Sequence, residues 1–227
     1  MIYSIMSARS TSSIVTKGIS LRNRKLGEMT HIAMSELEKM QSQMLYDAND
    51  PELAAMRKAA QDLCYEYNAL RPSDIKTQRL IMNKLLKRVA SHYEIRAPFW
   101  CDYGFNIEIG ENFFSNFNLI IIDCGRVIFG DNVMIGPDCC ISSAGHPLDS
   151  GRRNAGLEYA YTTIIEDNVW LGSGVHVMPG VSIGAGSVIG SGSIVTKDIP
   201  KNSLAFGNPC RVIRKITKEE ELRNWAR

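Results

Sequence analysis

The most constraining feature of the sequence is a six-residue repeat that runs without a gap from Ile165 to Val195. An aliphatic residue opens each unit, and a small or β-branched residue follows four positions later. The opening residues are Ile165, Leu171, Val177, Ile183, Ile189 and Val195. A period of six fits neither the 3.6-residue helix nor the two-residue alternation of a hairpin strand. It fits a chain that forms a short strand, turns and repeats, so that stacked aliphatic side chains build one continuous core.

The same pattern begins upstream near Ile109 and returns at Phe129, Ile135 and Ile141. Residues 142–163 interrupt it with Gly-His-Pro at 145–147 and with a polar run over 149–156. We therefore expect a coil domain over residues 97–215, with an excursion from the coil over residues 142–163. Loops that leave a repeat structure often lie on its functional face.

Residues 30–96 carry helix signals instead. Ser35-Glu-Leu-Glu38 is a capping box, and Asp50-Pro51 combines an N-cap with proline at the first helical position. Apolar residues then recur at steps of three and four over two stretches. They are Leu53, Met56, Ala60, Leu63, Cys64 and Tyr67, followed by Leu80, Ile81, Leu85, Leu86 and Val89. We expect an N-terminal helical segment over residues 30–96 that packs on the coil, and a short helical tail over residues 216–227.

Composition excludes several classes of protein. With 227 residues, 44% hydrophobic and 22% charged, the chain is typical of a soluble globular protein, and it has no apolar run long enough to span a membrane. A net charge of +2 disfavours nucleic acid as the main partner. The six cysteines form no C-x-x-C pair, which favours reduced thiols in a cytoplasmic protein.

Residues 1–29 form a separate extension with five basic residues and one acidic residue, Glu28. This composition resembles a mitochondrial targeting segment. The alternatives are a disordered tail, or a start codon that lies upstream of the true start at Met29.

Few residues have a pattern that points to chemistry. His146 lies where the excursion leaves the coil. A histidine at such a place can be exposed to solvent and still be fixed in position, which suits a general base. The alternative is an ordinary surface histidine. His176 sits inside a regular repeat, which favours a structural role. No H-x-x-H or H-E-x-x-H pattern occurs, so no metal is expected.

Seven blocks of sequence together resemble the maltose/galactoside O-acetyltransferase family of hexapeptide-repeat enzymes, and its maltose branch in particular. The match covers about residues 33–216. The blocks are Tyr46-Asp-Ala-Asn-Asp-Pro-Glu-Leu53, Cys101-Asp-Tyr-Gly104, Ser115-Asn-Phe-Asn118, Gly145-His-Pro147, Asn168-Val-Trp-Leu-Gly172, Ser193-Ile-Val-Thr-Lys-Asp198 and Pro209-Cys-Arg-Val-Ile-Arg214.

The resemblance implies a left-handed parallel β-helix in a homotrimer, with acetyl-CoA in a cleft between neighbouring subunits. His146 would remove the proton from a sugar hydroxyl, the 6-hydroxyl of maltose, glucose or a galactoside being expected. Asn116 would bind the acceptor or stabilise the intermediate, and Asp47 and Asp102 would contact the sugar. Trp170 would form a wall of the pantetheine channel, unless it is a core or trimer-contact aromatic. The other residues implied to hold the coenzyme are Ser173, Ser191, Thr196, Lys197, Arg211 and Arg214.

Two residues depart from the galactoside-type pattern, which has a second acid at position 124 and a methionine at position 158. This chain has Cys124 and Glu158 there, so we place Glu158 among the residues that bind the acceptor. A non-catalytic hexapeptide-repeat scaffold is the alternative to an enzyme. A zinc-dependent lyase of the same fold is a more remote third reading.

Overall fold

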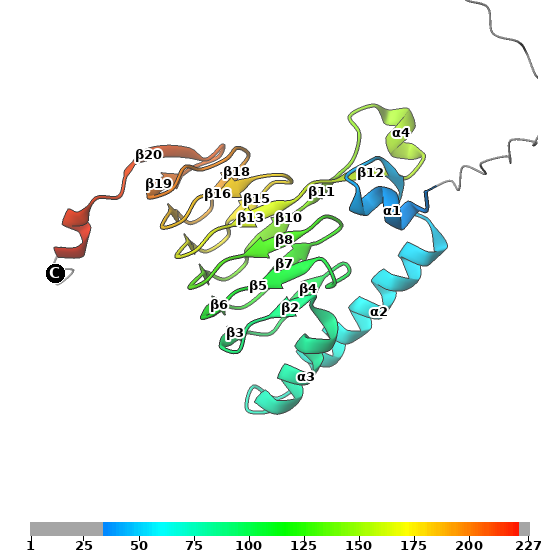
Figure 1. The fold of residues 1–227 in the computed structure, drawn as a ribbon, viewed down its shortest axis with the longest axis horizontal. Coiled ribbons are helices and arrows are strands. Elements are labelled where there is room, and N and C mark those ends of the chain that lie inside the picture. Colours follow the sequence, from blue (N-terminus) through cyan, green and yellow to red (C-terminus); the bar gives the residue numbers. More distant parts are fainter. Residues whose placement is uncertain (1–33, 223–227) are drawn as a thin grey trace, which may run out of the picture. The chain divides into compact units, whose positions relative to one another are not determined.

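The computed structural model describes residues 34–222, and the predicted extension over residues 1–29 lies outside them. The described part of the chain is mainly β structure, with helices before the coil (Figure 1). Its strands stack in parallel register, which confirms the predicted β-helix of hexapeptide turns. No helix within residues 34–222 is long and apolar enough to cross a membrane.

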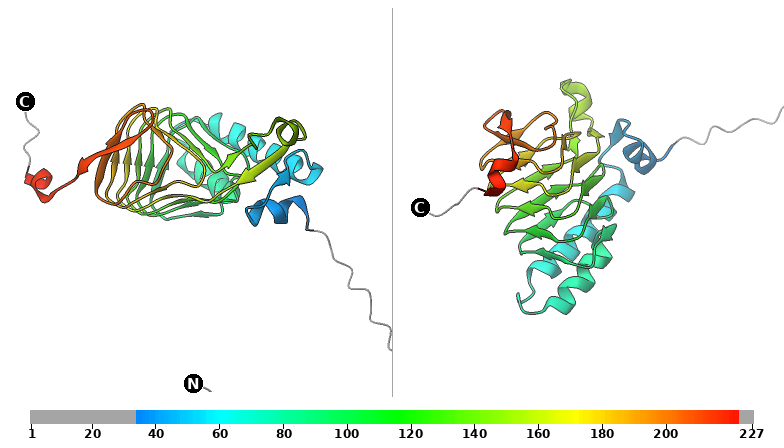
Figure 2. Two further views of the ribbon diagram at one scale, coloured as in Figure 1. Left: turned by 90° about the horizontal axis from the view of Figure 1, so that it is seen from above. Right: turned by 60° about the vertical axis from the view of Figure 1, so that its left-hand side comes forward.

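Each full turn of the coil adds one short strand to each of three sheets, here called faces 1, 2 and 3 (Figure 2). Face 1 contains β2 (Arg88–Val89), β5 (Ile107–Ile109), β8 (Val127–Phe129), β13 (Thr163–Ile165) and β16 (Ser182–Ile183). Face 2 contains β3 (Tyr93–Ile95), β6 (Phe113–Ser115), β9 (Met134–Ile135), β14 (Trp170–Leu171), β17 (Val188–Ile189), β19 (Ser203–Phe206) and β20 (Arg211–Lys215). Face 3 contains β4 (Phe99–Cys101), β7 (Leu119–Ile122), β10 (Cys140–Ser142), β15 (His176–Val177) and β18 (Ile194–Val195).

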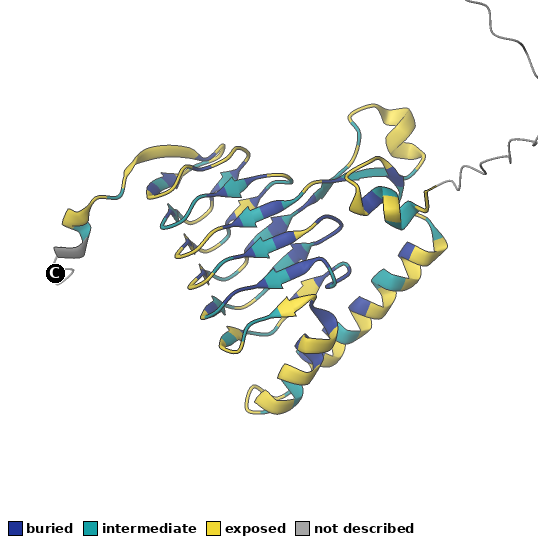
Figure 3. Cartoon of the chain, viewed as in Figure 1, coloured by how far each residue is buried: buried dark blue, intermediate teal, exposed yellow. Residues whose placement is uncertain are grey.

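The residues that open the repeats form the core of the coil. Ile165 is paired with Ile183, Leu171 with Ile189 and Val177 with Val195, so each turn consumes three repeats. All six side chains are fully buried, and buried residues follow the strands through the coil (Figure 3). A ladder of this kind removes aliphatic surface from water at every turn, which is the main favourable contribution to folding.

Glycine is required where the turns approach one another most closely. A Cβ atom added to Gly172 would lie 2.7 Å from the backbone nitrogen of Ser191 on the next turn. Any side chain at position 172 would therefore push two turns apart.

The N-terminal helices begin where the capping signals predict. Ser35 caps α1 (Glu36–Gln41) in a capping box, and Asp50 caps α2 (Pro51–Asn68) with Pro51 in the first turn. The predicted apolar face of α2 is buried at four positions, which are Leu53, Ala60, Cys64 and Tyr67. The last three pack with α3 (Ile75–Leu85) and the coil, whereas the first packs with Met40, Tyr46 and Tyr103. Leu80, which we expected on the apolar face of α3, is instead 62% exposed.

Both ends of the coil differ from the simplest expectation. The first strands, β2 and β3, lie within the segment 30–96 that carries the helix signals. Their residues lack the aliphatic-glycine pattern, and pairing with the second turn places them in the coil. At the other end, β20 pairs antiparallel with β19 before a short 3-10 helix, Lys218–Leu222, forms the predicted C-terminal helix.

Two neighbouring residues of β9 test the core. Ile135 is 1% exposed and points into the coil, whereas Met134 is 53% exposed. We expect Ile135→Ala to lower the free energy of unfolding by about 2–5 kcal/mol, because it leaves a cavity. Met134→Ala should lower it by less than about 1 kcal/mol. Urea unfolding at one protein concentration measures both, and equal losses would contradict an inward-facing ladder.

Candidate active site

The predicted excursion folds into a small sheet that carries His146. β11 (Ala144–Gly145) pairs antiparallel with β12 (Leu157–Ala160), and the short helix α4 (Ser150–Asn154) lies between them. On its other side β12 pairs with β1 (Tyr46–Asp47) from the N-terminal segment. The excursion is therefore held to the N-terminal segment through backbone hydrogen bonds, and His146 directly follows one of its strands.

The contacts of the His146 ring determine which nitrogen is free. Nδ1 lies 3.3 Å from the carbonyl oxygen of Leu157, and Nε2 lies 3.6 Å from Oε1 of Glu158. A carbonyl oxygen only accepts hydrogen bonds, so this contact places the proton of the neutral ring on Nδ1. Nε2 then keeps its lone pair, and the half-exposed ring is able to take up a proton there.

Glu158 is itself held by a buried hydroxyl. The Tyr46 hydroxyl donates to Oε2 of Glu158 at 2.5 Å, because Tyr46 and Glu158 are directly paired between β1 and β12. Tyr46 is fully buried, and burial raises the pKa of its hydroxyl far above the ordinary value, so it remains a donor. The bond leaves Oε1 of Glu158 on the side of His146.

Cys124 connects Glu158 to Asp102. Its Sγ atom lies 3.6 Å from Oδ2 of Asp102 and 3.8 Å from Oε2 of Glu158. Burial raises the pKa of the thiol, which keeps it neutral between two carboxylates. A carboxylate at position 124 would be repelled by both Asp102 and Glu158. Cysteine at this position therefore avoids that repulsion.

Asp123 fixes the backbone beneath Asp102. Its Oδ1 accepts hydrogen bonds from the N–H groups of Asp102 at 3.0 Å and Tyr103 at 2.8 Å. Asp123 is fully buried, and its Oδ2 has no hydrogen-bond partner among the described residues. Burial raises the pKa of Asp123 to about 8, although the hydrogen bond from Tyr103 acts in the opposite direction. Burial also raises the pKa of Asp102.

Asp47 belongs to the same assembly, since β1 pairs it with Leu157, the residue that holds His146. Its Oδ1 accepts the N–H of Asn49 at 2.9 Å in the turn before α2. Nearby, Arg57 donates to the hydroxyl of Tyr103 at 2.5 Å and to the carbonyl of Ala48 at 2.6 Å. The structure thus brings together four predicted residues, which are Asp47, Asp102, His146 and Glu158.

No sequence pattern marks four further residues of this cluster as functional. They are Tyr46, Arg57, Tyr103 and Asp123. Tyr46 lies in a block that carries the family resemblance, and Asp123 directly follows strand β7, but neither position has a local signal of its function. Arg57 is one of several charged residues on α2, and only the contact with Tyr103 distinguishes it.

The other predicted residues lie elsewhere on the coil. Asn116, Ser173 and Ser191 occupy turns between face 2 and face 3, here called the 2/3 corner. The two serines are exposed and lie on adjacent turns, since the carbonyl of Ser173 accepts the N–H of Gly192 at 2.8 Å. Trp170 is 53% exposed on face 2 beside this corner.

His146 and the remaining candidate residues lie away from the 2/3 corner. Thr196 and Lys197 follow β18 at the boundary of face 3 with face 1, here called the 3/1 corner. His146 lies on the excursion that leaves the coil at this corner after β10. Arg211 and Arg214 are exposed on β20, where Arg214 forms an ion pair with Glu220 at 2.6 Å. Among residues 34–222 no hydrogen bond or ion pair links His146 with Asn116. One chain therefore presents the predicted site as two separate halves.

No group of three or more side chains suited to hold a metal ion is present in the described part of the chain. A histidine beside carboxylates, on a coil of hexapeptide turns, is typical of one class of protein, the hexapeptide-repeat acyltransferases. Residues 39–90 match the family described as maltose acetyltransferase hexapeptide capping motif. Residues 162–197 match the family described as bacterial transferase hexapeptide.

Comparison with known proteins narrows this class. A Saccharomyces cerevisiae protein described as a candidate acetyltransferase is 50% identical over 188 residues, which is 82% of this chain and 96% of that protein. A galactoside acetyltransferase solved in complex with coenzyme A has a TM-score of 0.81 at 39% identity, covering 86% of this chain and 96% of that one. A maltose O-acetyltransferase from Clostridium difficile 630 has a TM-score of 0.79 at 44% identity, covering 82% and 100%. The chain belongs to the maltose/galactoside O-acetyltransferase family and is an acetyltransferase.

Asp123 makes stability depend on pH. Its folded-state pKa of about 8 lies above the ordinary value of 3.8, so its neutral form is favoured by folding. The stability that this provides is complete below about pH 4 and is lost as the pH rises through about 8. Asp123→Asn keeps an oxygen for the two N–H donors but does not ionise. Between about pH 5 and pH 9, the native chain should lose about 4 kcal/mol more stability than this variant.

Urea unfolding at a series of pH values measures this difference. Parallel stability curves for the native chain and the Asp123→Asn variant would show that Asp123 is ionised in the folded state.

Proposed function

We propose that this protein transfers an acetyl group from acetyl-CoA directly to a hydroxyl group of a sugar, with His146 as the general base. The 6-hydroxyl of maltose, glucose or a galactoside is the proposed acceptor. The observation that carries the proposal is the contact of His146 Nδ1 with the carbonyl oxygen of Leu157, because this contact leaves Nε2 free to take a proton. The relatives named for maltose and galactoside acetylation support the acceptor class.

In the reaction, Nε2 of His146 takes the hydroxyl proton as the acceptor oxygen attacks the thioester carbonyl. The carbon–sulfur bond then breaks, and the imidazolium returns its proton to the leaving thiolate of coenzyme A. Glu158 lies 3.6 Å from Nε2 and stabilises the imidazolium while it exists. Tyr46 positions Glu158 for this role through its hydrogen bond at 2.5 Å.

The acceptor is bound by carboxylates. Asp47, Asp102 and Glu158 are hydrogen-bond acceptors that suit the hydroxyl groups of a sugar. Because Oε2 of Glu158 is already occupied by Tyr46, its Oε1 is the atom that remains for the acceptor. The neutral thiol of Cys124 lies between Asp102 and Glu158 in this group of side chains.

Asn116 has a geometry suited to stabilise the developing oxyanion. Its Oδ1 accepts the N–H of Phe117 at 2.9 Å, so the carboxamide presents its NH₂ group outward. Donors placed where negative charge develops are usually the largest single contribution to acyl transfer. Asn116 would contact either the acceptor or this oxyanion.

The coenzyme would lie along the 2/3 corner, where Ser173 and Ser191 are exposed on successive turns and Trp170 forms a wall beside them. Its phosphates require cations, which Lys197, Arg211 and Arg214 would supply, and the hydroxyl of Thr196 would donate a hydrogen bond. Arg214 would exchange its ion pair with Glu220 for a phosphate.

A homotrimer would unite the two halves of the site. Since His146 lies on the excursion from the 3/1 corner and Asn116 at the 2/3 corner, one chain does not assemble them. Contact between the 3/1 corner of one copy and the 2/3 corner of the next joins two different surfaces. Such a contact gives a closed trimer when each copy is rotated by a third of a turn from the last. We propose that each active site is shared by two neighbouring subunits.

The first test is His146→Ala with acetyl-CoA and maltose, glucose or a thiogalactoside as acceptor. Loss of a general base costs about 100-fold to 10,000-fold in rate, so CoA release should fall by at least about 100-fold. The matched control is His92→Ala, since His92 is exposed and interacts only with the first coil turns. Its release of CoA should equal that of the native chain.

Wild-type turnover by His146→Ala would rule out His146 as the base. The alternative function, a non-catalytic scaffold, predicts no acceptor-dependent CoA release from the native chain itself.

Mixing two inactive variants tests whether subunits share the site. His146→Ala and Asn116→Ala would each be inactive alone. If the subunits mix at random on refolding together, about a quarter of the sites should pair an intact His146 with an intact Asn116. CoA release should therefore recover to about a quarter of the native rate in the mixture. Each variant refolded alone is the control, and mixed trimers without activity would show that one chain holds the whole site.

A further inference from the structure

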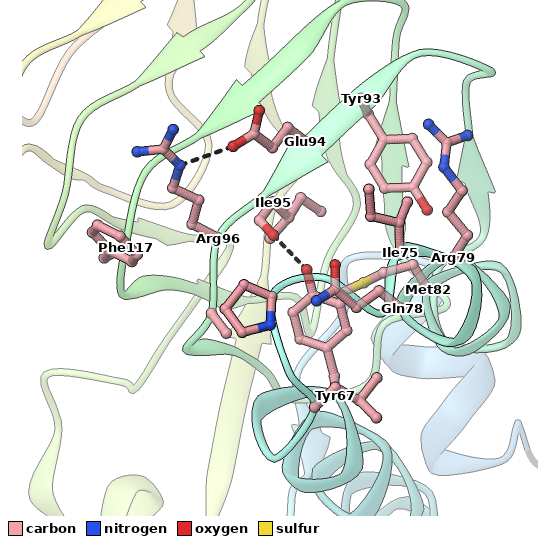
Figure 4. A pocket seen from close by; sticks show the side chains of 13 residues that line it. Tyr67, Ile75, Gln78, Arg79, Met82, Tyr93, Glu94, Ile95, Arg96 and Phe117 are labelled. Atoms are coloured by element: carbon pink, nitrogen blue, oxygen red, sulfur yellow. Dashed lines mark hydrogen bonds and ion pairs between the residues drawn. The ribbon is translucent and has the colours of Figure 1, made fainter.

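A pocket of about 530 Å³ lies at the N-terminal end of the coil, away from His146. It is enclosed by the end of α2, by α3, by β3 and by Phe117 of the second turn (Figure 4). None of its lining residues belongs to the proposed catalytic set, although Phe117 directly follows Asn116. Its volume falls in the range of sites for small ligands, about 300–1,000 Å³.

The walls of the pocket are mostly apolar and aromatic. Tyr67, Met82 and Ile95 form its buried side, and the hydroxyl of Tyr67 is used by a hydrogen bond to the carbonyl of Ile95. Ile75 and Phe117 border it while remaining 59% and 53% exposed. Covering the flat apolar face of a ligand would remove apolar surface from water and so stabilise the complex.

One polar group in the wall has no partner. The hydroxyl oxygen of Tyr93 is buried, and the described residues offer it no hydrogen bond. Leaving such a group unpaired costs about 1–3 kcal/mol, so a ligand that accepts its hydrogen bond recovers this loss. Burial raises the pKa of Tyr93, which keeps the hydroxyl protonated and able to donate.

The charge of the lining is positive. The guanidinium of Arg79 lies 5.2 Å from the centre of the Tyr93 ring and donates to the carbonyl of Ser91 at 2.9 Å. No carboxylate within the described part of the chain pairs with Arg79, whereas the acid of the lining, Glu94, is paired with Arg96 at 2.8 Å. One uncompensated cation therefore stands beside one unpaired donor.

We propose that this pocket binds a small planar apolar molecule that carries one anionic group, such as an aryl carboxylate or sulfonate. The apolar body lies between the aromatic and aliphatic walls. The anionic group accepts the hydrogen bond of the Tyr93 hydroxyl and faces Arg79. None of the residues proposed for acyl transfer lines this site.

The probe is anilinonaphthalene sulfonate, a planar aromatic monoanion whose fluorescence rises in apolar sites, used with the full chain. Excess coenzyme A is present to fill the proposed coenzyme site. We expect saturable binding of one probe per chain. Naphthoate should displace the probe at least about tenfold more effectively than the neutral naphthamide, because only the carboxylate matches Arg79.

Two variants locate the binding. Ile75→Trp fills the pocket from an exposed position of α3 and should abolish saturable binding, whereas Leu80→Trp, on the same helix outside the pocket, should leave it unchanged. Tyr93→Phe removes only the donor and should weaken binding about two- to tenfold. Thermal unfolding of each variant confirms that it is folded.

Three results would overturn the proposal. They are the absence of saturable binding, as when another copy of the chain covers the pocket, native affinity in folded Ile75→Trp, and equal displacement by naphthoate and naphthamide. Loss of CoA release from the native chain bears on the acetyltransferase mechanism alone and leaves these measurements unaffected.

Discussion

The structure depends on one constraint, the in-register stacking of turns that each consume three hexapeptides. Ile165, Leu171 and Val177 lie directly below Ile183, Ile189 and Val195, and every one of these side chains is fully buried. Stacking at this distance leaves no room for a side chain at Gly172, which faces the backbone of Ser191. The turns are thus closely stacked, and each corner has a defined place along the coil.

The proposed catalytic histidine depends on this stacking only indirectly. His146 does not lie on the coil but on an excursion that is tied to β1 from the N-terminal segment. The pairing of Tyr46 with Glu158 places a buried hydroxyl against a carboxylate, and that carboxylate faces His146. Asp123 contributes in the same way by holding the backbone of Asp102. The proposed acceptor side is therefore built from three segments that are distant in the sequence.

Much of this could be predicted from residues that signal their own conformation. The repeat predicted the coil, and Ser35 and Asp50 predicted where two helices begin, because a cap depends only on its nearest neighbours. Leu80 was misplaced because periodicity shows which residues share a face but not how far a neighbouring element covers it. Tyr46 and Asp123 went unassigned because their roles arise from partners 112 and 20 residues away.

The sequence by itself determined the hexapeptide coil, the helix starts, the excursion and the family, since each depends on local patterns or on blocks of matching residues. Only the tertiary structure decided that Asp102, Cys124 and Glu158 form one wall, that Nδ1 of His146 faces a carbonyl, and that Asn116 lies at another corner. The reason is that a coil places residues by turn and corner. Contacts across turns and with the excursion therefore depend on the three-dimensional register of the turns. The spacing of residues along the chain does not predict them.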